Sequence, residues 1–329
     1  MKRLYHTVAF AIIILFLLPL GVQAAELLIP GGQVVGLQLQ NGTVTVAAFD
    51  DVHGSAARNA GFQIGDEILS INGIPVACAE DIRSALSAGP ACVEVGIRRN
   101  GTARTLKASP RNTADGPRLG ICLKQGITGI GTVTWIDPAT GIFGTLGHGV
   151  SDARGCPLQL TRGTAYHAQV ISVKKGLCGE PGLLRGNANA LDICGTLTRN
   201  TPQGVFGKTA APWRGEPLPV SDFDEIHTGR ASIRSTLAGT DVQEYSVEIL
   251  KIYPEDRPDG RNFLIRVTDP VLLSKTGGIV QGMSGSPIIQ DGKLIGAVTH
   301  VLVNDPTRGY GIFIENMLDA VKNSQNRGA

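Results

Sequence analysis

The chain has 329 residues, of which 42% are hydrophobic, which is enough to bury the cores of two or three domains and excludes a disordered protein. Its formal charge is only +2 and its basic residues are scattered, so nucleic acid is not an expected partner. The 43 glycines, with many Val, Ile and Thr residues, favour short strands joined by tight turns. We therefore expect a mainly β protein.

The amino terminus has the pattern of an export signal. Lys2 and Arg3 precede an uninterrupted apolar stretch, residues 8–20, and small residues follow at Val22-Gln23-Ala24, where a signal peptidase cleaves. The stretch is shorter than the roughly 20 residues of a spanning helix, which favours cleavage over anchoring. Residues 1–24 are predicted to be a signal peptide or, alternatively, a membrane anchor, with the remaining chain exported and extracytoplasmic.

The cysteines give no sign of a metal site. The six of them, at positions 78, 92, 122, 156, 178 and 194, can pair in an exported chain, but their connectivity cannot be read from the sequence. The chain has no C-x-x-C or HExxH motif and no zinc-finger spacing. Structural disulfides or buried small side chains are favoured, and neither a metal nor another cofactor is expected.

Residues 25–110 carry the pattern of a PDZ domain. Within residues 55–73, a helical turn of small residues, a Gly65-Asp66 turn, a strand and an Asn72-Gly73 turn follow one another, and this order resembles the bacterial PDZ domain. A helix is expected at residues 80–88, followed by a hairpin with a type I′ turn at Asn100-Gly101.

A PDZ domain binds an extended peptide between a strand edge and a helix, and loop amides hold the terminal carboxylate of the peptide. The expected loop and strand edge are Gly36, Leu37, Gln38 and Leu39, and the expected apolar pocket consists of Ile82, Ala85 and Leu86. The peptide ligand comes from another protein or from an internal segment of this chain. The alternative is a packing module without a ligand.

A second domain is predicted at residues 119–329, after a polar linker at residues 111–118. The glycines of residues 126–131 do not form a dinucleotide-binding loop, because a strand and not a helix follows them. Apolar runs separated by Gly and Pro then predict a barrel of short antiparallel strands, ending in a short helix from about Glu315.

Ser284 is the candidate nucleophile of this domain. It lies in Gln281-Gly282-Met283-Ser284-Gly285-Ser286-Pro287, directly before an apolar strand. The flanking glycines permit positive φ and bring amide N–H groups close to a reacting carbonyl, as acyl transfer requires. The alternative is a β-turn rich in Gly, Ser and Pro. A serine nucleophile also needs a histidine base and a group that orients that base.

His148 is the candidate base, because it stands between two glycines at the end of a predicted strand, residues 142–146. The competing histidines are His167, His227 and His300, of which only His300 also lies near the serine in sequence. Asp269 ends another predicted strand, upstream of the serine, and is the candidate orienting carboxylate. Asp152, Asp192 and Asp305 are its alternatives.

Together these motifs resemble the SpoIVB family, the sporulation stage IV signalling serine peptidases of spore-forming Firmicutes. The strings TLGHGVSD, VTDPVLL, GMSGSPIIQDGKLIGAVTH and VNDPTRGYGIFIENM carry the resemblance, with the export signal and a PDZ domain placed before the peptidase. The resemblance implies a small α/β PDZ domain followed by a chymotrypsin-like double β-barrel.

Ser284 is then the nucleophile, His148 the general base and acid, and Asp269 the residue that orients His148. The backbone amides of Gly282 and Ser284 are expected to bind the oxyanion, and Ser286 is not the nucleophile. Asp269 is the weakest of these assignments, because it lies only fifteen positions before the serine. Gly278 at the expected pocket base gives no reason to expect a Lys or Arg preference.

The resemblance further implies a role in the forespore intermembrane space. There the enzyme cleaves itself and cuts the extracytoplasmic part of a membrane inhibitor complex, which frees an intramembrane protease to process the sigma-K precursor. Its partners are this substrate at the membrane surface, itself, and the PDZ ligand. One alternative is a general envelope quality-control protease resembling the HtrA group, whose PDZ domain follows the peptidase. The other is a non-catalytic PDZ adaptor.

Overall fold

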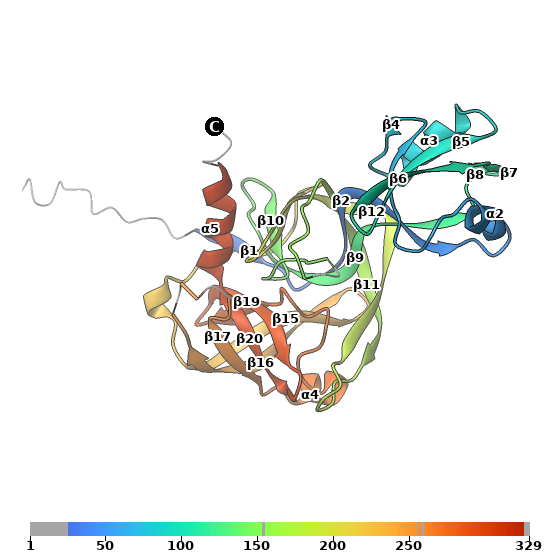
Figure 1. The fold of residues 1–329 in the computed structure, drawn as a ribbon. Helices are drawn as coiled ribbons and strands as arrows, with labels where there is room; N and C mark the ends of the chain where they lie inside the picture. Colours follow the sequence, from blue (N-terminus) through green and yellow to red (C-terminus); the bar gives the residue numbers. More distant parts are fainter. Residues whose placement is uncertain (1–25, 153–154, 255, 258–259, 326–329) are drawn as a thin grey trace, which may run out of the picture.

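The computed structural model describes residues 26–152, 155–254, 256–257 and 260–325, so the predicted signal or anchor lies outside the described residues. Over this range the chain is mainly β and forms two β-barrels and a small α/β domain (Figure 1). The expected fold class is confirmed. In the described part of the chain, no helix is both long and apolar enough to cross a membrane.

The first barrel closes in the order β9-β10-β13-β12-β11-β2, because β2 also pairs with β9. Its strands are β2 (Val34–Phe49), β9 (Ile121–Ile136), β10 (Ile142–Thr145), β11 (Arg162–Lys174), β12 (Leu183–Thr201) and β13 (Gly204–Thr209). Two short strands, β1 (Leu27–Pro30) and β14 (Leu218–Pro219), extend the sheet beside β9. β11 and β12 are longer than predicted, because Gly186 and Gly195 lie within β12 and do not end it.

The small α/β domain is inserted between β2 and β9 and has the predicted PDZ elements. These are α2 (Gly54–Asn59), β3 (Glu67–Ile71), β4 (Ile74–Pro75), α3 (Ala79–Ser87), β5 (Val93–Arg99) and β6 (Thr102–Ala108). α3 lies within one residue of the predicted helix. The β5–β6 hairpin turns at Asn100 and Gly101 with φ of +50° and +80°, as the predicted type I′ turn requires.

The domain boundaries differ from the predicted ones. The first half of β2 pairs with β11 in the first barrel, whereas its second half pairs with β3 of the small domain. β9 pairs with both halves of β2. Residues 27–39 therefore belong to the first barrel, although they were expected in the PDZ domain. The expected linker forms a hairpin, β7 (Arg111–Thr113) and β8 (Gly116–Arg118).

The second barrel is a closed ring in the order β15-β16-β17-β20-β19-β18. Its strands are β15 (Gly229–Ala238), β16 (Asp241–Ile252), β17 (Phe263–Val267), β18 (Pro287–Gln290), β19 (Lys293–Leu302) and β20 (Asp305–Phe313). The 3₁₀ helix η1 (Phe223–Glu225) precedes β15, α4 (Pro270–Thr276) follows β17, and α5 (Ile314–Gln325) ends the described chain. Phe263 and Phe313 meet edge to face at 4.6 Å in the barrel core.

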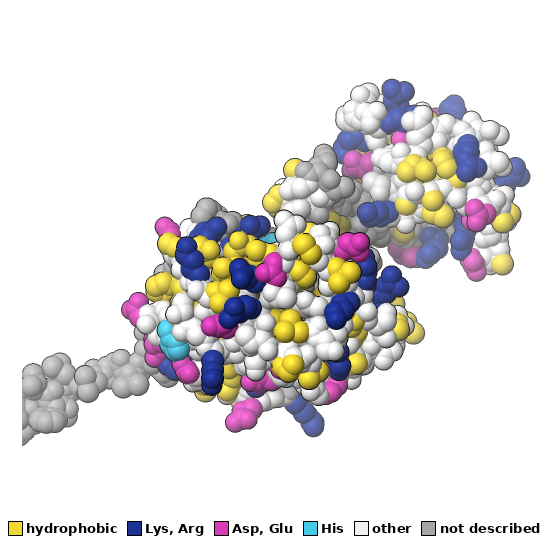
Figure 2. Space-filling model, turned by 90° about the horizontal axis from the view of Figure 1, so that it is seen from below, with side chains coloured by type: hydrophobic (Ala, Val, Ile, Leu, Met, Phe, Trp, Pro, Cys, Tyr) yellow, Lys and Arg dark blue, Asp and Glu magenta, His cyan; other side chains and the backbone are white. Residues whose placement is uncertain are grey.

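The two barrels pack against each other, and the small domain forms a lobe that stands away from the second barrel (Figures 1 and 2). Trp135 of β9 shares a buried cluster with Ala297 of β19 and Ile312 of β20, which joins the barrels. On the face shown in Figure 2, basic and acidic side chains are interspersed. The line between the barrels is where the candidate residues meet.

Candidate active site

The Ser284 loop connects α4 to β18 and has the backbone that its glycines predicted. Gly282 and Gly285 have φ of +98° and +96°. A Cβ on Gly285 would lie 2.1 Å from the carbonyl oxygen of Thr132 in β9, so only glycine permits this contact between the barrels. Ser284 is half-buried, whereas Ser286 is completely buried. Of the two serines, Ser284 is the one that a substrate can reach.

Two amides of this loop are available to an oxyanion. In the described part of the chain, the N–H groups of Gly282 and Ser284 donate no hydrogen bond to a protein acceptor. These are the amides that the sequence predicted as the oxyanion hole. Unused and half-buried donors on one loop are what the stabilisation of a tetrahedral intermediate requires.

The direction of both amides is set by their neighbours. The carbonyl of Gln281 accepts the N–H of Leu184 in β12 at 2.8 Å, and the carbonyl of Met283 accepts the N–H of Ser286 at 2.9 Å. In a trans peptide the carbonyl and the following N–H point in opposite directions. The two available N–H groups therefore point away from these neighbours and are held in place.

His148 lies at the end of β10, where the chain turns sharply. Leu146 has φ of +70° although it is not glycine, a conformation that costs roughly 1–2 kcal/mol. The following residue, Gly147, approaches β19 so closely that a Cβ would lie 2.9 Å from the side chain of Thr299. The turn brings the His148 ring to 5.0 Å, centroid to centroid, from the ring of His300.

His148 is oriented by a backbone carbonyl. Its Nδ1 lies 2.9 Å from the carbonyl oxygen of Gly149. Because a carbonyl can only accept, Nδ1 carries the proton and Nε2 is left as the basic nitrogen. Burial lowers the pKa of His148 below its ordinary value of 6.5, against a smaller opposite effect of the bond to Gly149. His148 is thus neutral at pH 7 and able to accept a proton.

Asn200 of β12 holds the segment that follows His148. Its side-chain oxygen accepts the N–H of Val150, and its side-chain nitrogen donates to the carbonyls of Val150 and Leu158, each at 2.8 Å. The carbonyl that orients His148 lies one residue before Val150. Asn200 was missed in the sequence, because nothing local marks an asparagine that bonds to residues about 50 positions away.

Ser284 and His148 are brought together on β19 but are not hydrogen-bonded to each other. The Ser284 hydroxyl donates to the carbonyl of Thr299 at 2.7 Å. Thr299 is also the residue against which the His148 turn packs, and its neighbour is His300. Catalytic hydrogen bonds are often unformed without substrate. A change of hydroxyl partner is therefore required before proton transfer.

The structure does not pair Asp269 with His148, which contradicts the predicted orienting role. Asp269 is the N-cap of α4, where its carboxylate accepts the N–H groups of Val271 and Leu272 at 2.9 Å and that of Ser246 at 3.4 Å. An aspartate before a proline at the first helical position is a preferred cap. Its carboxylate is used by the helix.

The other candidates also have partners elsewhere. The Asp152 carboxylate accepts the N–H of Cys156, Asp192 lies 4.0 Å from His167, and Asp305 bonds Thr307 and Arg308. His227 pairs with Asp291 at 2.9 Å on the exposed surface. Among the described residues, no carboxylate bonds to His148.

We predict that Asp269 contributes to stability rather than to chemistry. Asp269→Ala is expected to lower the free energy of unfolding by about 1 kcal/mol through loss of the cap. Asp269→Asn, which also caps, is expected to keep both stability and activity. Chemical denaturation and peptidase assays of the two variants check this. A folded but inactive asparagine variant would assign the carboxylate a catalytic role.

The predicted PDZ edge at Gly36–Leu39 is wrong. This segment pairs with β11 on one side and with β9 on the other, so it has no free edge. Val35, Leu37 and Leu39 are buried in the first barrel. The glycine-containing strand entry that suggested this edge serves close packing, since a Cβ on Gly36 would lie 2.4 Å from Ala188.

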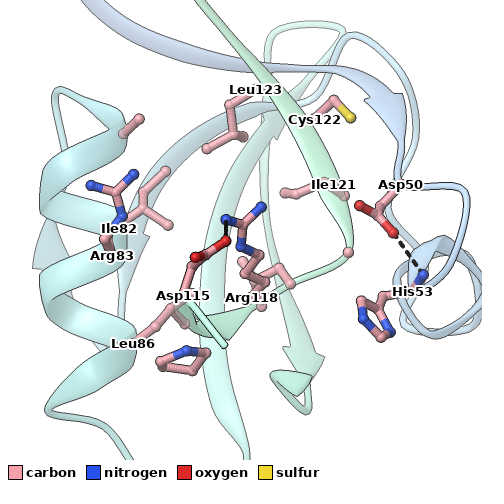
Figure 3. A pocket seen from close by; sticks show the side chains of 14 residues that line it. Asp50, His53, Ile82, Arg83, Leu86, Asp115, Arg118, Ile121, Cys122 and Leu123 are labelled. Atoms are coloured by element: carbon pink, nitrogen blue, oxygen red, sulfur yellow. Dashed lines mark hydrogen bonds and ion pairs between the residues drawn. The ribbon is translucent and has the colours of Figure 1, made fainter. Parts of the chain in front are cut away.

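The free edge lies instead on β9. In the described structure, residues 121–125 of β9 pair only with β2, and their other edge faces α3. A cavity of about 260 Å³ separates them (Figure 3). Of the predicted pocket residues, Ile82 and Leu86 line it, whereas Ala85 packs against the core. Ile121, Cys122 and Leu123 lie on the opposite wall, and the paired side chains of Asp115 and Arg118 also line the cavity (Figure 3).

The loop before this edge has the amides that a carboxylate needs. In the described part of the chain, the N–H groups of Leu119 and Gly120 donate no hydrogen bond. The Gly120 carbonyl accepts the N–H of Asp50, which braces the loop from behind. The sequence signal was present as Leu119-Gly120-Ile121, a glycine between apolar residues before a strand, but this stretch lay beyond the predicted boundary of the domain.

The six cysteines are all unpaired, and only Cys194 is buried. Burial raises the pKa of Cys194 to about 11. The other five cysteines are neither disulfide-bonded nor buried, so neither of the two favoured interpretations describes them. Within the described residues, no three His, Cys, Asp or Glu side chains are placed to share a metal ion.

The geometry agrees with the comparison of the chain with known families. The model of the SpoIVB peptidase S55 family matches residues 115–318, more than half of the chain. The chain belongs to the SpoIVB peptidase S55 family. A PDZ domain model matches residues 51–99, in the predicted order. This S55 member is therefore a serine peptidase that carries a PDZ domain before most of its peptidase region.

More distant similarities add little. A protein of Rhizobium meliloti (strain 1021), named as a putative zinc metalloprotease, R01501, is 40% identical over 79 residues, which are 24% of this chain and 21% of that protein. The inactive form of the Rv3671c protease matches with a TM-score of 0.35 and 15% identity, over 59% of this chain and 83% of that one. The active form from M. tuberculosis matches with a TM-score of 0.35 and 16% identity, over 59% and 72%.

Proposed function

We propose that this S55 peptidase uses Ser284 as nucleophile, His148 as general base and acid, and the amides of Gly282 and Ser284 as oxyanion hole. The observation that carries the proposal is the convergence on β19 of a histidine loop from the first barrel and a serine loop from the second, beside two oriented and unused amides. The ring of His227 bonds to Asp291, and that of His167 lies beside Asp192 and Trp213, so neither of these histidines takes this position.

The steps follow from the groups present. The Ser284 hydroxyl leaves the Thr299 carbonyl, transfers its proton to Nε2 of His148 and attacks the substrate carbonyl. The two amides receive the oxyanion, and His148 returns the proton to the leaving amine. Water then repeats the sequence on the acyl-enzyme. The Gly149 carbonyl takes the place of the usual carboxylate, since it accepts from Nδ1 in both protonation states.

The PDZ groove is proposed to select the substrate. An extended peptide adds to the free edge of β9, its terminal carboxylate at the amides of Leu119 and Gly120 and its last apolar side chain between Ile82 and Leu86. The walls of the cavity are mostly apolar, which favours an aliphatic last residue. The carboxylate explains why the donors of the loop are left unused.

The biological role that we propose is the one that the resemblance to the SpoIVB family implies. The enzyme is exported, acts in the forespore intermembrane space, cleaves itself, and cuts the extracytoplasmic part of a membrane inhibitor complex that controls processing of the sigma-K precursor. Family membership and the export-type amino terminus support this role. A general envelope quality-control protease is the competing role, and it predicts equal cleavage of any unfolded protein.

The purified chain from residue 25 onward is expected to cleave itself, which intact mass measured over time will show. An excess of a peptide with an aliphatic last residue and a free carboxylate is expected to slow this cleavage, because it occupies the groove. The same peptide with an amidated end is the matched control and should have no effect. A constant mass would contradict the self-cleavage role, and equal effects of both peptides would contradict the assigned groove.

A further inference from the structure

Thr132 is a completely buried residue of β9 that touches the serine loop at several points. Its hydroxyl donates to the carbonyl of Gly282 at 2.8 Å, and its N–H donates to the carbonyl of Ser284 at 3.0 Å. Its own carbonyl oxygen would lie only 2.1 Å from a Cβ placed on Gly285, so it contacts that residue closely. One residue of the first barrel thus contacts three residues of a loop that belongs to the second.

The two carbonyls held by Thr132 alternate with the two held by other neighbours. The carbonyls of Gln281 and Met283 are bonded by Leu184 and Ser286, and those of Gly282 and Ser284 by Thr132. Every carbonyl from Gln281 to Ser284 therefore has a fixed direction, and so do the peptide planes between them. Of these four bonds, only the one from the Thr132 hydroxyl comes from a side chain, so it alone can be removed by a side-chain substitution that leaves the backbone unchanged.

We propose that Thr132 is a positioning residue of the peptidase, whose hydroxyl fixes the serine loop in the geometry that binds the oxyanion. The proposal rests on the proposed function, in which the amides of Gly282 and Ser284 are the oxyanion donors. Without the hydroxyl, the Gly282 carbonyl is a part-buried acceptor without a protein partner, and the peptide turns to find one. The N–H groups of Gly282 and Ser284, which lie on either side of this peptide, then no longer point toward the same oxyanion position.

The test uses a fluorophosphonate probe, which requires no knowledge of the substrate. The Ser284 oxygen forms a bond to phosphorus, fluoride leaves, and the proton passes to His148, while the phosphoryl oxygen occupies the oxyanion hole. Thr132→Val removes the hydroxyl at nearly constant volume. We expect the maximal labelling rate to fall about tenfold or more, less than the loss of an oxyanion donor itself, with the half-saturating probe concentration unchanged.

Two variants serve as matched controls. Thr132→Ser retains the hydroxyl and is expected to restore the labelling rate close to that of the unmodified chain. Thr134→Val, two positions along β9, removes an equally buried hydroxyl that has no hydrogen-bond partner, and should leave the rate unchanged. Thermal unfolding of each variant reports folding. If the valine variant does not fold, Thr132→Ala removes the hydroxyl without adding a methyl group.

The outcomes separate this inference from the function on which it rests. Failure of the unmodified chain to label at Ser284 contradicts the proposed nucleophile. Labelling at Ser284 with an unchanged rate in Thr132→Val overturns the positioning role alone. An equal fall in Thr132→Val and Thr134→Val, or a fall that Thr132→Ser does not reverse, also overturns it, because the loss would then follow from packing of β9.

Discussion

Replacement of Ser284 by alanine is expected to abolish hydrolysis of peptide bonds and labelling by a fluorophosphonate. Loss of a nucleophile of this kind lowers kcat by on the order of 10⁴- to 10⁶-fold, and the remainder comes from binding and the oxyanion hole. The fold should be unaffected, because the Ser284 side chain makes one hydrogen bond, to the Thr299 carbonyl, at a half-buried position. Activity, labelling and thermal unfolding measured on the same preparation check this.

Ser286→Ala is the matched control, since the two serines lie two positions apart on the same loop. The Ser286 hydroxyl is buried and has no hydrogen-bond partner, so alanine removes an unsatisfied polar group. Its backbone N–H, which holds the Met283 carbonyl, is retained. Full activity of this variant beside an inactive Ser284→Ala would confirm the nucleophile. The reverse pattern would exchange the two serines.

His148→Ala is expected to reduce activity nearly as far as Ser284→Ala, and the double variant should be no worse than either, because the nucleophile and its base act as one unit. The pH dependence gives a second measure. Burial lowers the pKa of His148 below 6.5, and the base works only when neutral. The labelling rate should therefore fall as the pH falls, with a midpoint below pH 6.5.

His300 is the control for this prediction, because its ring is the neighbour of His148 on β19. His300→Asn is expected to keep most of the labelling rate and the same midpoint. If His300→Asn is inactive and His148→Ala is active, the base has been assigned to the wrong histidine. A midpoint above pH 6.5 in the unmodified chain would contradict the effect assigned to burial.

The turns and strands of this protein could be predicted because their signals are local. Asn100-Gly101 and Asp291-Gly292 both adopt positive φ in two-residue hairpin turns, which few other residue pairs permit. The serine loop was predictable for the same reason, since Gly282 and Gly285 indicate positive φ on both sides of Ser284. The order of the domains was predicted from the resemblance to the SpoIVB family, and the two family matches confirm this order.

The contacts that complete the site could not be predicted, because they join distant parts of the chain. Thr132 lies about 150 positions before the loop that it holds, and in sequence it is one threonine of an alternating strand. Asp269 was misassigned for a different reason, because a local signal in the sequence was given too little weight. Its neighbour Pro270 marks the start of a helix, which favours Asp269 as the helix cap. The position of Asp269 upstream of the serine was a weaker argument for a catalytic role.

The peptide edge was misplaced because two stretches carry the same signal. Val35-Gly36-Leu37 and Leu119-Gly120-Ile121 each put a glycine between apolar residues at the entry to a strand. Which of them faces the helix depends on the order in which the strands are threaded, and this is a property of the whole fold. The first is enclosed by strands on both sides, whereas the second has α3 for a neighbour.

The sharing of β2 and β9 between the PDZ domain and the first barrel also limits when these two strands can pair. β2 is synthesised before the PDZ domain and β9 after it, so the two neighbouring barrel strands cannot pair until some 70 intervening residues have been made and their ends brought together. Truncation at a domain boundary would remove a barrel strand. A chain without its PDZ domain is obtained only by joining the first half of β2 to the second half of β9 through a new turn, which makes them a hairpin.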